Sequence, residues 1–262
     1  MQQLSKVKQW LAGLTPGIEI GAFKTPIPGI RPIYIDKYAT YANAPCLADY
    51  QGEAIALPFK TNSLGYVASS HVLEHVANPV RALVEWYRVL RPGGLIYLVV
   101  PDRRYTWDHP RAPTTVEHMI ADYIEKKTPV DGTHIDDFVE NIDWSRYSPT
   151  TSAEGRPKAK EDLRQLYWAT VNSGSEINIH FHVFEPNNLR GLIEALKWHP
   201  DLRLKWKLVD LEEQFPEENP IGILAVIRVR KSFNDRIQAV FHRLRRLAFR
   251  ESDLLPTAQR FN

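Results

Sequence analysis

The sequence is poor in cysteine, in long apolar runs and in net charge. Its one cysteine, Cys46, excludes an intrachain disulfide and a zinc site built on several thiolates. No apolar stretch approaches the length of a membrane span, and the first residues lack the apolar run of a signal peptide, so we expect a cytoplasmic protein. Lys plus Arg number 33 against 31 Asp plus Glu, a balance that argues against a nucleic-acid partner.

One short motif raises the question of a metalloenzyme. His71, Glu74 and His75 have the H-x-x-E-H spacing in which two histidines on one helical face hold Zn²⁺ and the glutamate activates water. The residues before them, Leu64–Ser70, have the small and β-branched composition of a buried strand, and Pro79 interrupts a helix continuing from His75. His71 is therefore expected at the end of a strand, and a zinc hydrolase is the less favoured reading.

Strand and helix patterns alternate along the chain. Apolar residues at helical spacing follow Pro79, and a second buried strand is expected at 95–102, which completes a βαβ unit with a right-handed crossover. Further strands are expected at 17–21, 32–36, 202–211 and 221–231, and a helix at 185–199. The pattern predicts an α/β protein with a doubly wound, Rossmann-like sheet that binds its ligands at the carboxyl ends of the strands.

The run from Glu53 to Asp102 contains "LPF", "SSHVLEH" and "RVLRPGG" in that order, with "IEIG" and "YID" upstream. This order of motifs resembles the core of the class I S-adenosylmethionine-dependent methyltransferases. The resemblance implies that S-adenosylmethionine is the cofactor and that residues 1–102 form the cofactor-binding half. More widely, the chain is similar to methyltransferase-like proteins of bacterial surface-glycan synthesis.

The resemblance assigns cofactor roles to residues that follow the first two strands. Glu19, Gly21 and Ala22 match the loop where a glycine lets the backbone approach the methionine part of the cofactor. Asp36, followed by Lys37, matches the carboxylate that accepts hydrogen bonds from the ribose hydroxyls. Without a functional role, the loop at Glu19 to Ala22 would be an ordinary turn at the end of a strand, and Asp36 would simply cap the second strand.

Two further pairs complete the implied cofactor site. Glu53 matches the acidic residue beside the adenine amino group, with Ala54 supplying a backbone contact, although a solvated surface glutamate is nearly as good an explanation. Ser70 and His71 are expected to line the methionine end of the pocket.

The chain departs from the family pattern in two places. Gly21 is followed by prolines at 26, 28 and 32 instead of a glycine-rich loop and a helix, so a proline-stiffened loop is expected to make the crossing to the second strand. Gly65 stands where the family commonly has Asp. These departures leave open a methyltransferase-like binding or scaffold protein without activity.

The segment 103–179 is too long for a simple connection, so we expect a helical or irregular insertion after the fifth strand that serves as a lid or substrate subdomain. Its flat apolar faces suit either stacking on sugar rings or a small core of its own. They are Tyr105, Trp107, Tyr123, Trp144, Tyr147, Tyr167 and Trp168.

The histidines of this part of the chain are the candidate proton acceptors. His118, His134, His180 and His182 stand among Asp122, Asp136 and Asp137. The alternation in "INIHFHVF" predicts that His180 and His182 lie on one face of a strand. They could act there as a general base with its partner, bind a metal ion, or serve a structural role. We expect methyl transfer to an oxygen of a sugar or glycan precursor, with His180 or His182 as the catalytic base and without a resident metal.

The last part of the chain divides into 180–231, which is expected to complete the core, and a basic tail at 232–262. In the tail, Val240, Leu244 and Leu247 share a helical face that arginines flank. Such a helix suits peripheral contact with the inner face of the membrane, or docking on the chain's own domain or a second subunit.

Overall fold

The centre of the fold is a mixed eight-stranded sheet with the strand order β10-β5-β2-β1-β6-β7-β9-β8. The computed structural model describes residues 1–231 and 254–261. Strands β5, β2, β1, β6 and β7 run parallel, whereas β9 runs antiparallel to both of its neighbours and β10 is antiparallel to β5. The strands are β1 Gly17–Ile20, β2 Ile33–Asp36, β5 Tyr50–Gln51, β6 Leu64–Ser70, β7 Leu90–Pro101, β8 Trp206–Phe215, β9 Gly222–Val229 and β10 Gln259–Arg260.

The sheet reverses its winding direction next to β1. From β1 the chain moves outward through β2 to β5, then returns to place β6 on the other side of β1 and continues to β7. Connections that leave in opposite directions open a crevice at the carboxyl ends of the two central strands. The predicted doubly wound sheet is confirmed, and the crevice at β1 and β6 is the expected place for a ligand.

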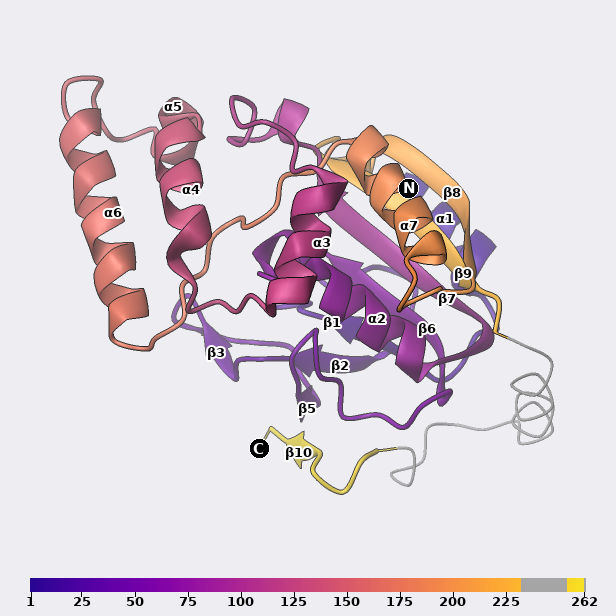
Figure 1. The fold of residues 1–262 in the computed structure, drawn as a ribbon. Helices are drawn as coiled ribbons and strands as arrows, with labels where there is room; N and C mark the ends of the chain where they lie inside the picture. The colour runs from indigo at the N-terminus through magenta and orange to yellow at the C-terminus, as the bar shows by residue number, and fades with distance from the viewer. Residues whose placement is uncertain (232–253, 262) are drawn as a thin grey trace.

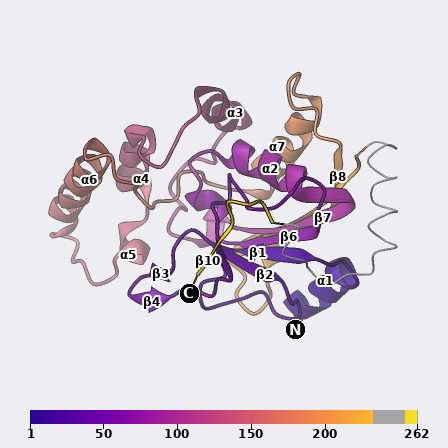
Figure 2. The ribbon, with the colours of Figure 1, turned by 90° about the horizontal axis from the view of Figure 1, so that it is seen from below.

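Helices cover the two faces of the sheet unequally (Figures 1 and 2). Helices α2 (Pro79–Val89) and α7 (Pro186–Trp198) bury their apolar sides on one face, and α3 (Val116–Glu125) packs on both of them. The opposite face is covered by α1 (Gln2–Leu11), whose Val7 and Leu11 belong to a second apolar cluster with residues of β6, β7 and β9.

The described residues 21–32, which connect β1 to β2, form no helix, as the prolines predict. This loop is held against the sheet by Glu19, because Oε1 of Glu19 accepts a hydrogen bond from the backbone N–H of Ile27 at 2.9 Å. Ile27 is itself buried in the cluster beside α1. The loop therefore takes the covering position that a crossover helix would occupy.

The predicted βαβ unit is confirmed, with one difference in its second strand. Helix α2 begins at Pro79, where the side chain of Asn78 caps it by accepting from the Arg81 N–H at 2.9 Å. Strand β7 begins at Leu90, earlier than predicted, because the "RPGG" residues form a bulge between two stretches of pairing with β6. Gly93 takes a φ of 83° in this bulge, a conformation that favours glycine.

Two other predicted segments need correction. Strand β8 begins at Trp206 instead of Leu202, because a turn at 200–202 and three irregular residues follow α7. The residues 177–183 form no strand, so the alternation that was to place His180 and His182 on one face does not apply. The sequence analysis also did not foresee α1 or the small hairpin of β3 (Thr40–Tyr41) and β4 (Ala44–Pro45).

The segment between β7 and α7 forms helices around an apolar cluster of its own. Besides α3 it contains α4 (Ile135–Asn141), α5 (Trp144–Tyr147) and α6 (Arg156–Asn172), with short 3₁₀ turns at Arg103–Tyr105 (η2) and Gly132–His134 (η3). A further 3₁₀ turn, η1 (Leu73–His75), lies outside this segment, between β6 and α2. Helices α4, α5 and α6 lie to one side of the sheet in Figure 1. Trp107, Trp144, Tyr147 and Tyr167 pack in this cluster, which favours the structural explanation for these aromatic residues.

The basic tail lies mostly outside the described residues, and so do Val240, Leu244 and Leu247. At its end, β10 pairs with β5 at the edge of the sheet. The membrane contact of the tail stays a prediction. Within residues 1–231 and 254–261, none of the helices combines the length and apolar character that crossing a bilayer demands.

Candidate functional site

A cavity of about 350 Å³ opens at the carboxyl ends of β1, β2 and β6, where the winding of the sheet reverses. Its far wall comes from the helical segment, through Lys127, Pro129 and the residues 176–178. The predicted cofactor residues that line it are Gly21, Ala22, Asp36, Lys37, Glu53, Ala54, Ser70 and His71. Residues matched from three separate strand ends therefore meet in one cavity.

Gly21 is required by the backbone at the end of β1. It has a φ of 69°, and a Cβ at this position would lie only 2.5 Å from Cγ2 of Val72. The wall of the cavity is consequently bare backbone at this point, which leaves room for a ligand to approach.

Glu19 lies next to this wall but does not line the cavity. Its side chain is 1% exposed and points toward the loop at 21–32, where Oε1 holds Ile27 while Oε2 has no hydrogen-bond partner. Burial raises the pKa of Glu19 to about 7, and the bond from Ile27 offsets part of this effect. The contact that the structure shows for Glu19 is with the covering loop.

Gly65, where the family commonly has Asp, does not line the cavity. Gly65 lies near the start of β6, whereas the cavity is at the other end of this strand, at Ser70. A Cβ on Gly65 would lie 2.9 Å from an Arg91 side-chain nitrogen and 3.1 Å from the backbone nitrogen of Thr15. Close packing favours a glycine, because a larger residue here would require the Arg91 side chain and the backbone around Thr15 to shift.

Asp36 ends β2 with a buried carboxylate on the cavity wall. It is 8% exposed, and its Oδ1 accepts from the backbone N–H of Tyr38 at 2.9 Å. Burial raises the pKa of Asp36 above its ordinary value, although backbone hydrogen bonds from Tyr38 and Lys37 act in the opposite direction. A carboxylate held in this way can accept hydrogen bonds from a ligand's hydroxyl groups.

Polar residues from the helical segment reach across the mouth of the cavity. Lys37 forms an ion pair with Glu176, and the hydroxyl of Tyr38 donates to the same carboxylate at 3.4 Å. The side-chain amide of Asn178 donates to the hydroxyl of Tyr41 at 2.9 Å. Glu176 and Asn178 were not foreseen, because no local pattern indicates which distant residues will meet Lys37 and Tyr41.

His71 follows β6 in an unusual conformation. It has a φ of 55°, which non-glycine residues adopt rarely and mostly at functional sites, and its N–H bonds to the carbonyl of Val99 at 2.9 Å. Its Nδ1 lies 3.6 Å from Oε1 of Glu74, within ion-pair distance. The imidazole is 36% exposed, whereas the Glu74 side chain is buried.

Glu74 carries a buried carboxylate that accepts no hydrogen bond. Burial tends to raise its pKa, but the neighbouring histidines, His71 first, outweigh this effect and hold the pKa below its ordinary value. His75 also lines the cavity, and burial lowers the pKa of its imidazole.

The geometry does not support the zinc-protease reading of the H-x-x-E-H motif. Leu73–His75 is one 3₁₀ turn, and His71 lies outside it, so the two histidines do not share a helical face. Glu74 and His75 instead group with His180.

The two histidines chosen as base candidates do not line the cavity and belong to different clusters. Nδ1 of His180 lies 2.6 Å from Oδ2 of Asp108, whose other oxygen pairs with the buried Arg111 at 2.7 Å. His182 is completely buried beside Asp122, and burial lowers the pKa of its imidazole to about 3. Their predicted pairing on one face is wrong, and a proton acceptor inside the cavity has to be another residue.

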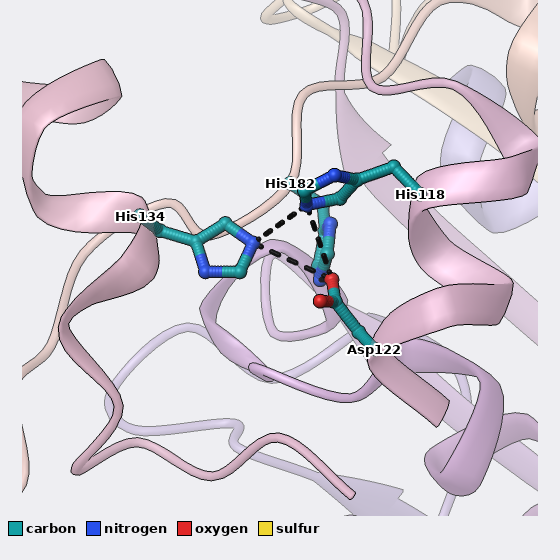
Figure 3. A group of neighbouring side chains, drawn as sticks. All are labelled: His118, Asp122, His134 and His182. Atoms are coloured by element: carbon teal, nitrogen blue, oxygen red, sulfur yellow. Dashed lines mark hydrogen bonds and ion pairs between the residues drawn. The ribbon is translucent and has the colours of Figure 1, made fainter. Parts of the chain in front are cut away.

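A second group of histidines gathers around Asp122 (Figure 3). His118, His134 and His182 direct side-chain nitrogens toward its carboxylate, which is buried with no hydrogen-bond partner for Oδ2. This group lies behind the cavity wall, since Nε2 of His182 is 3.3 Å from the carbonyl of the cavity residue Ala77.

One part of the chain matches the model of a known family. The model of a methyltransferase domain matches residues 35–98. An uncharacterised transposon-encoded protein of Streptomyces fradiae is 34% identical over 105 residues, which are 37% of this chain and 29% of that protein. A demethylmenaquinone methyltransferase of Staphylococcus aureus is 27% identical over 144 residues, 53% of this chain and 56% of that enzyme. The chain thus spans less than two thirds of the length of both relatives.

Two similar solved structures are S-adenosylmethionine-dependent methyltransferases. One, from Thermotoga maritima, is 18% identical with a TM-score of 0.44 and covers 88% of both chains. The other, from Methanosarcina mazei, is 15% identical with a TM-score of 0.45 and covers 87% of this chain and 98% of that one. Residues 35–98 therefore match a methyltransferase domain, and the doubly wound sheet of this chain contains them.

Proposed function

We propose that the protein binds S-adenosylmethionine in the cavity at the strand ends and transfers its methyl group to a hydroxyl oxygen of a sugar or glycan precursor. The observation that carries the proposal is the meeting of Gly21, Asp36 and His71 on one cavity wall inside a methyltransferase domain. These residues come from the ends of β1, β2 and β6, so a cofactor that touches all of them lies across the switch point.

Each cavity residue has a role in this proposal. Asp36 accepts hydrogen bonds from the two ribose hydroxyls, and the bare backbone at Gly21 and Ala22 faces the methionine part. Glu53 and Ala54 flank the adenine. The ion pair between Lys37 and Glu176 then closes over the bound cofactor, because it joins the end of β2 to the helical segment.

The transfer itself is an in-line displacement. A lone pair of the acceptor oxygen forms a bond to the methyl carbon, the carbon–sulfur bond breaks with its electrons returning to sulfur, and the hydroxyl proton has to leave. We assign this proton to Nε2 of His71, because the carboxylate of Glu74 beside Nδ1 favours the tautomer that carries its proton on Nδ1. His71 is the base in place of His180 or His182.

Support for a hydroxylated acceptor comes from the outer part of the cavity. Tyr38 and Tyr41 are 40% and 44% exposed and stack on each other with ring centroids 6.3 Å apart. Aromatic faces beside the carboxylate of Glu176 and the amide of Asn178 suit a ring that carries several hydroxyls.

Calorimetry with S-adenosylmethionine is the first test. Wild-type protein is expected to bind it, and Asp36→Ala is expected to raise the Kd at least about tenfold, since hydrogen bonds to a charged group are worth roughly 1.5–3 kcal/mol. The matched control is Asp162→Ala, an exposed carboxylate on α6 that should leave the Kd unchanged. Absence of binding would overturn the proposal.

Methyl transfer is measured separately with methyl-labelled cofactor and a panel of acceptors that includes hydroxylated sugars and a demethylated quinone. Label in the sugar arm is the expected result. Label in the quinone alone would assign the chain a quinone acceptor, the kind of substrate in the name of the Staphylococcus aureus relative. Cofactor binding without transfer to any acceptor would identify a binding or scaffold protein.

A further inference from the structure

The cluster around Asp122 brings donor atoms from three separate parts of the chain to one point (Figure 3). His118 and Asp122 lie one turn apart on α3, His134 ends the 3₁₀ turn η3, and His182 lies in the segment that leads to α7. Their ligand atoms all lie within 4.8 Å of one another. Helix α3, η3 and this segment therefore meet through polar side chains at one place.

The distances between these atoms match those of a tetrahedral metal site. Nε2 of His118 and Nε2 of His134 are 3.0 Å apart and lie 3.3 and 3.4 Å from Oδ2 of Asp122, and Nε2 of His182 lies 3.6 Å from the same oxygen. Zinc bonds of 2.0–2.2 Å at tetrahedral angles separate neighbouring donor atoms by about 3.3 Å. One cation at the centre would thus reach all four side chains with small adjustments.

Hydrogen bonds alone do not account for the arrangement. Oδ2 of Asp122 is buried and accepts no hydrogen bond of proper geometry, although three imidazole nitrogens surround it. A buried carboxylate oxygen without a partner is costly. A cation removes that cost, because it takes a lone pair from each surrounding atom.

The surroundings of the cluster prepare two of the histidines for coordination. Nδ1 of His134 lies 3.1 Å from the hydroxyl of Thr133, which can accept a hydrogen bond from an Nδ1 proton, and in that tautomer the Nε2 lone pair is free. Nε2 of His182 has a competing contact, the carbonyl of Ala77 at 3.3 Å, which is long for a hydrogen bond. The second ring nitrogen of His182 has no partner and can carry the proton instead.

We propose that His118, Asp122, His134 and His182 bind one divalent transition-metal cation of the zinc class. Three imidazoles and a carboxylate suit Zn²⁺ better than Mg²⁺ or Ca²⁺, which prefer oxygen ligands. Four protein ligands leave no open position for a substrate, so the site is structural. The cation fastens the segment that carries Glu176 and Asn178 to α3, and in this way holds the far wall of the cavity in place.

The group of Glu74, His75 and His180 is a weaker candidate. It offers three donor residues instead of four, and Nδ1 of His180 is already engaged by Asp108 at 2.6 Å. A His75 variant removes a ligand from this group alone, so its effect on metal binding shows which of the two groups holds the metal.

The test is a titration of the full chain with metal after chelation and removal of the chelator. Co²⁺ is the probe, because tetrahedral coordination gives it intense visible absorption bands, and Zn²⁺ should displace it with a stoichiometry of one. His118→Ala is the main variant, since its side chain is 50% exposed and its loss leaves the fold intact. It should weaken Co²⁺ binding by about 10-fold or more, whereas the exposed His109→Ala and the cavity variant His75→Gln should leave binding unchanged.

Thermal unfolding is the second measurement. Free Zn²⁺ at a hundred times its Kd should raise the Tm of wild-type protein by roughly 5–10 °C, and this rise should shrink in His118→Ala and Asp122→Ala. The proposal is wrong if no Co²⁺ bands appear, which would leave a proton-sharing network only. It is equally wrong if the bands vanish in His75→Gln and persist in His118→Ala. Neither measurement involves S-adenosylmethionine, so the results of both are independent of the proposed methyl transfer.

Discussion

The ammonium of Lys37, one residue beyond the end of β2, forms an ion pair with the carboxylate of Glu176, which the chain reaches only after it has built most of the helical segment. The two side chains are 27% and 37% exposed, so water screens the pair in part. Their contact joins the strand-end side of the cavity to its far wall.

Glu176→Gln should weaken S-adenosylmethionine binding by about 1.5- to 5-fold at low salt, the range expected for a partly exposed ion pair. The difference from wild type should shrink at high salt because the attraction is screened. Calorimetry at two ionic strengths measures this, with Glu161→Gln on α6 as the control, since Glu161 pairs with Arg164 away from the cavity. A deficit that does not change with salt would assign Glu176 a role other than the ion pair.

His71→Gln should lower kcat by about 10²- to 10⁴-fold, the usual contribution of a general base, while cofactor affinity changes far less. His109→Gln, an exposed histidine outside the cavity, is the control. Steady-state kinetics measures the loss of kcat, and calorimetry measures the cofactor affinity. If His180→Gln or His182→Gln abolishes turnover while His71→Gln does not, the original choice of base is correct.

Glu19 should make the stability of the ligand-free protein depend on pH. Because its pKa is raised to about 7 in the folded chain from 4.5, the native state holds a proton between these values that the unfolded chain releases. The contribution of Glu19 to the free energy of unfolding is thus fully present below pH 4.5. It falls by about 3 kcal/mol as the pH rises through 7. Glu19→Gln cannot titrate, so its free energy of unfolding should fall less between about pH 5 and pH 8.

Urea denaturation at the two pH values measures that difference, and the other titrating groups cancel when the variant is compared with wild type. The glutamine side chain of the variant keeps an oxygen that can accept from the N–H of Ile27, so the loop at 21–32 retains its anchor. Identical pH dependence of the two proteins would mean that Glu19 is ionised in the folded chain.

Arg111→Met should lower the free energy of unfolding by about 3–5 kcal/mol, because it leaves a buried carboxylate without its cation. The Arg111 side chain is completely buried, pairs with Asp108 and Asp137 at 2.7 Å, and donates to the carbonyl of His180 at 2.9 Å. The control, Lys158→Met, breaks the exposed pair with Asp162 and should cost at most about 0.5 kcal/mol. A loss for Arg111→Met no larger than for Lys158→Met would contradict the importance of this network.

Local sequence patterns were sufficient for the central strands of the sheet and for helices α2 and α7, but not for α1 or the edge strands β5 and β10. The run at Leu64–Ser70 and the helix that begins at Pro79 were placed correctly, because buried strands and N-terminal prolines depend on neighbouring residues alone. The prolines after Gly21 likewise excluded a crossover helix. The residues that the order of motifs singled out at the strand ends line one cavity, apart from Glu19, which faces the covering loop, and their cofactor roles stay a prediction.

Tertiary structure alone decided which distant side chains meet. Lys37 meets Glu176, and Asp108 meets His180, across long stretches of chain, through contacts that no periodicity encodes. In the proposed metal site, helical spacing brings His118 and Asp122 together, but only the fold adds His134 and His182. His180 and His182 show the reason most clearly. Alternation would place them together only if their backbone were an extended strand, but these residues follow the irregular path between α6 and α7, so one imidazole turns to Asp108 and the other to Asp122.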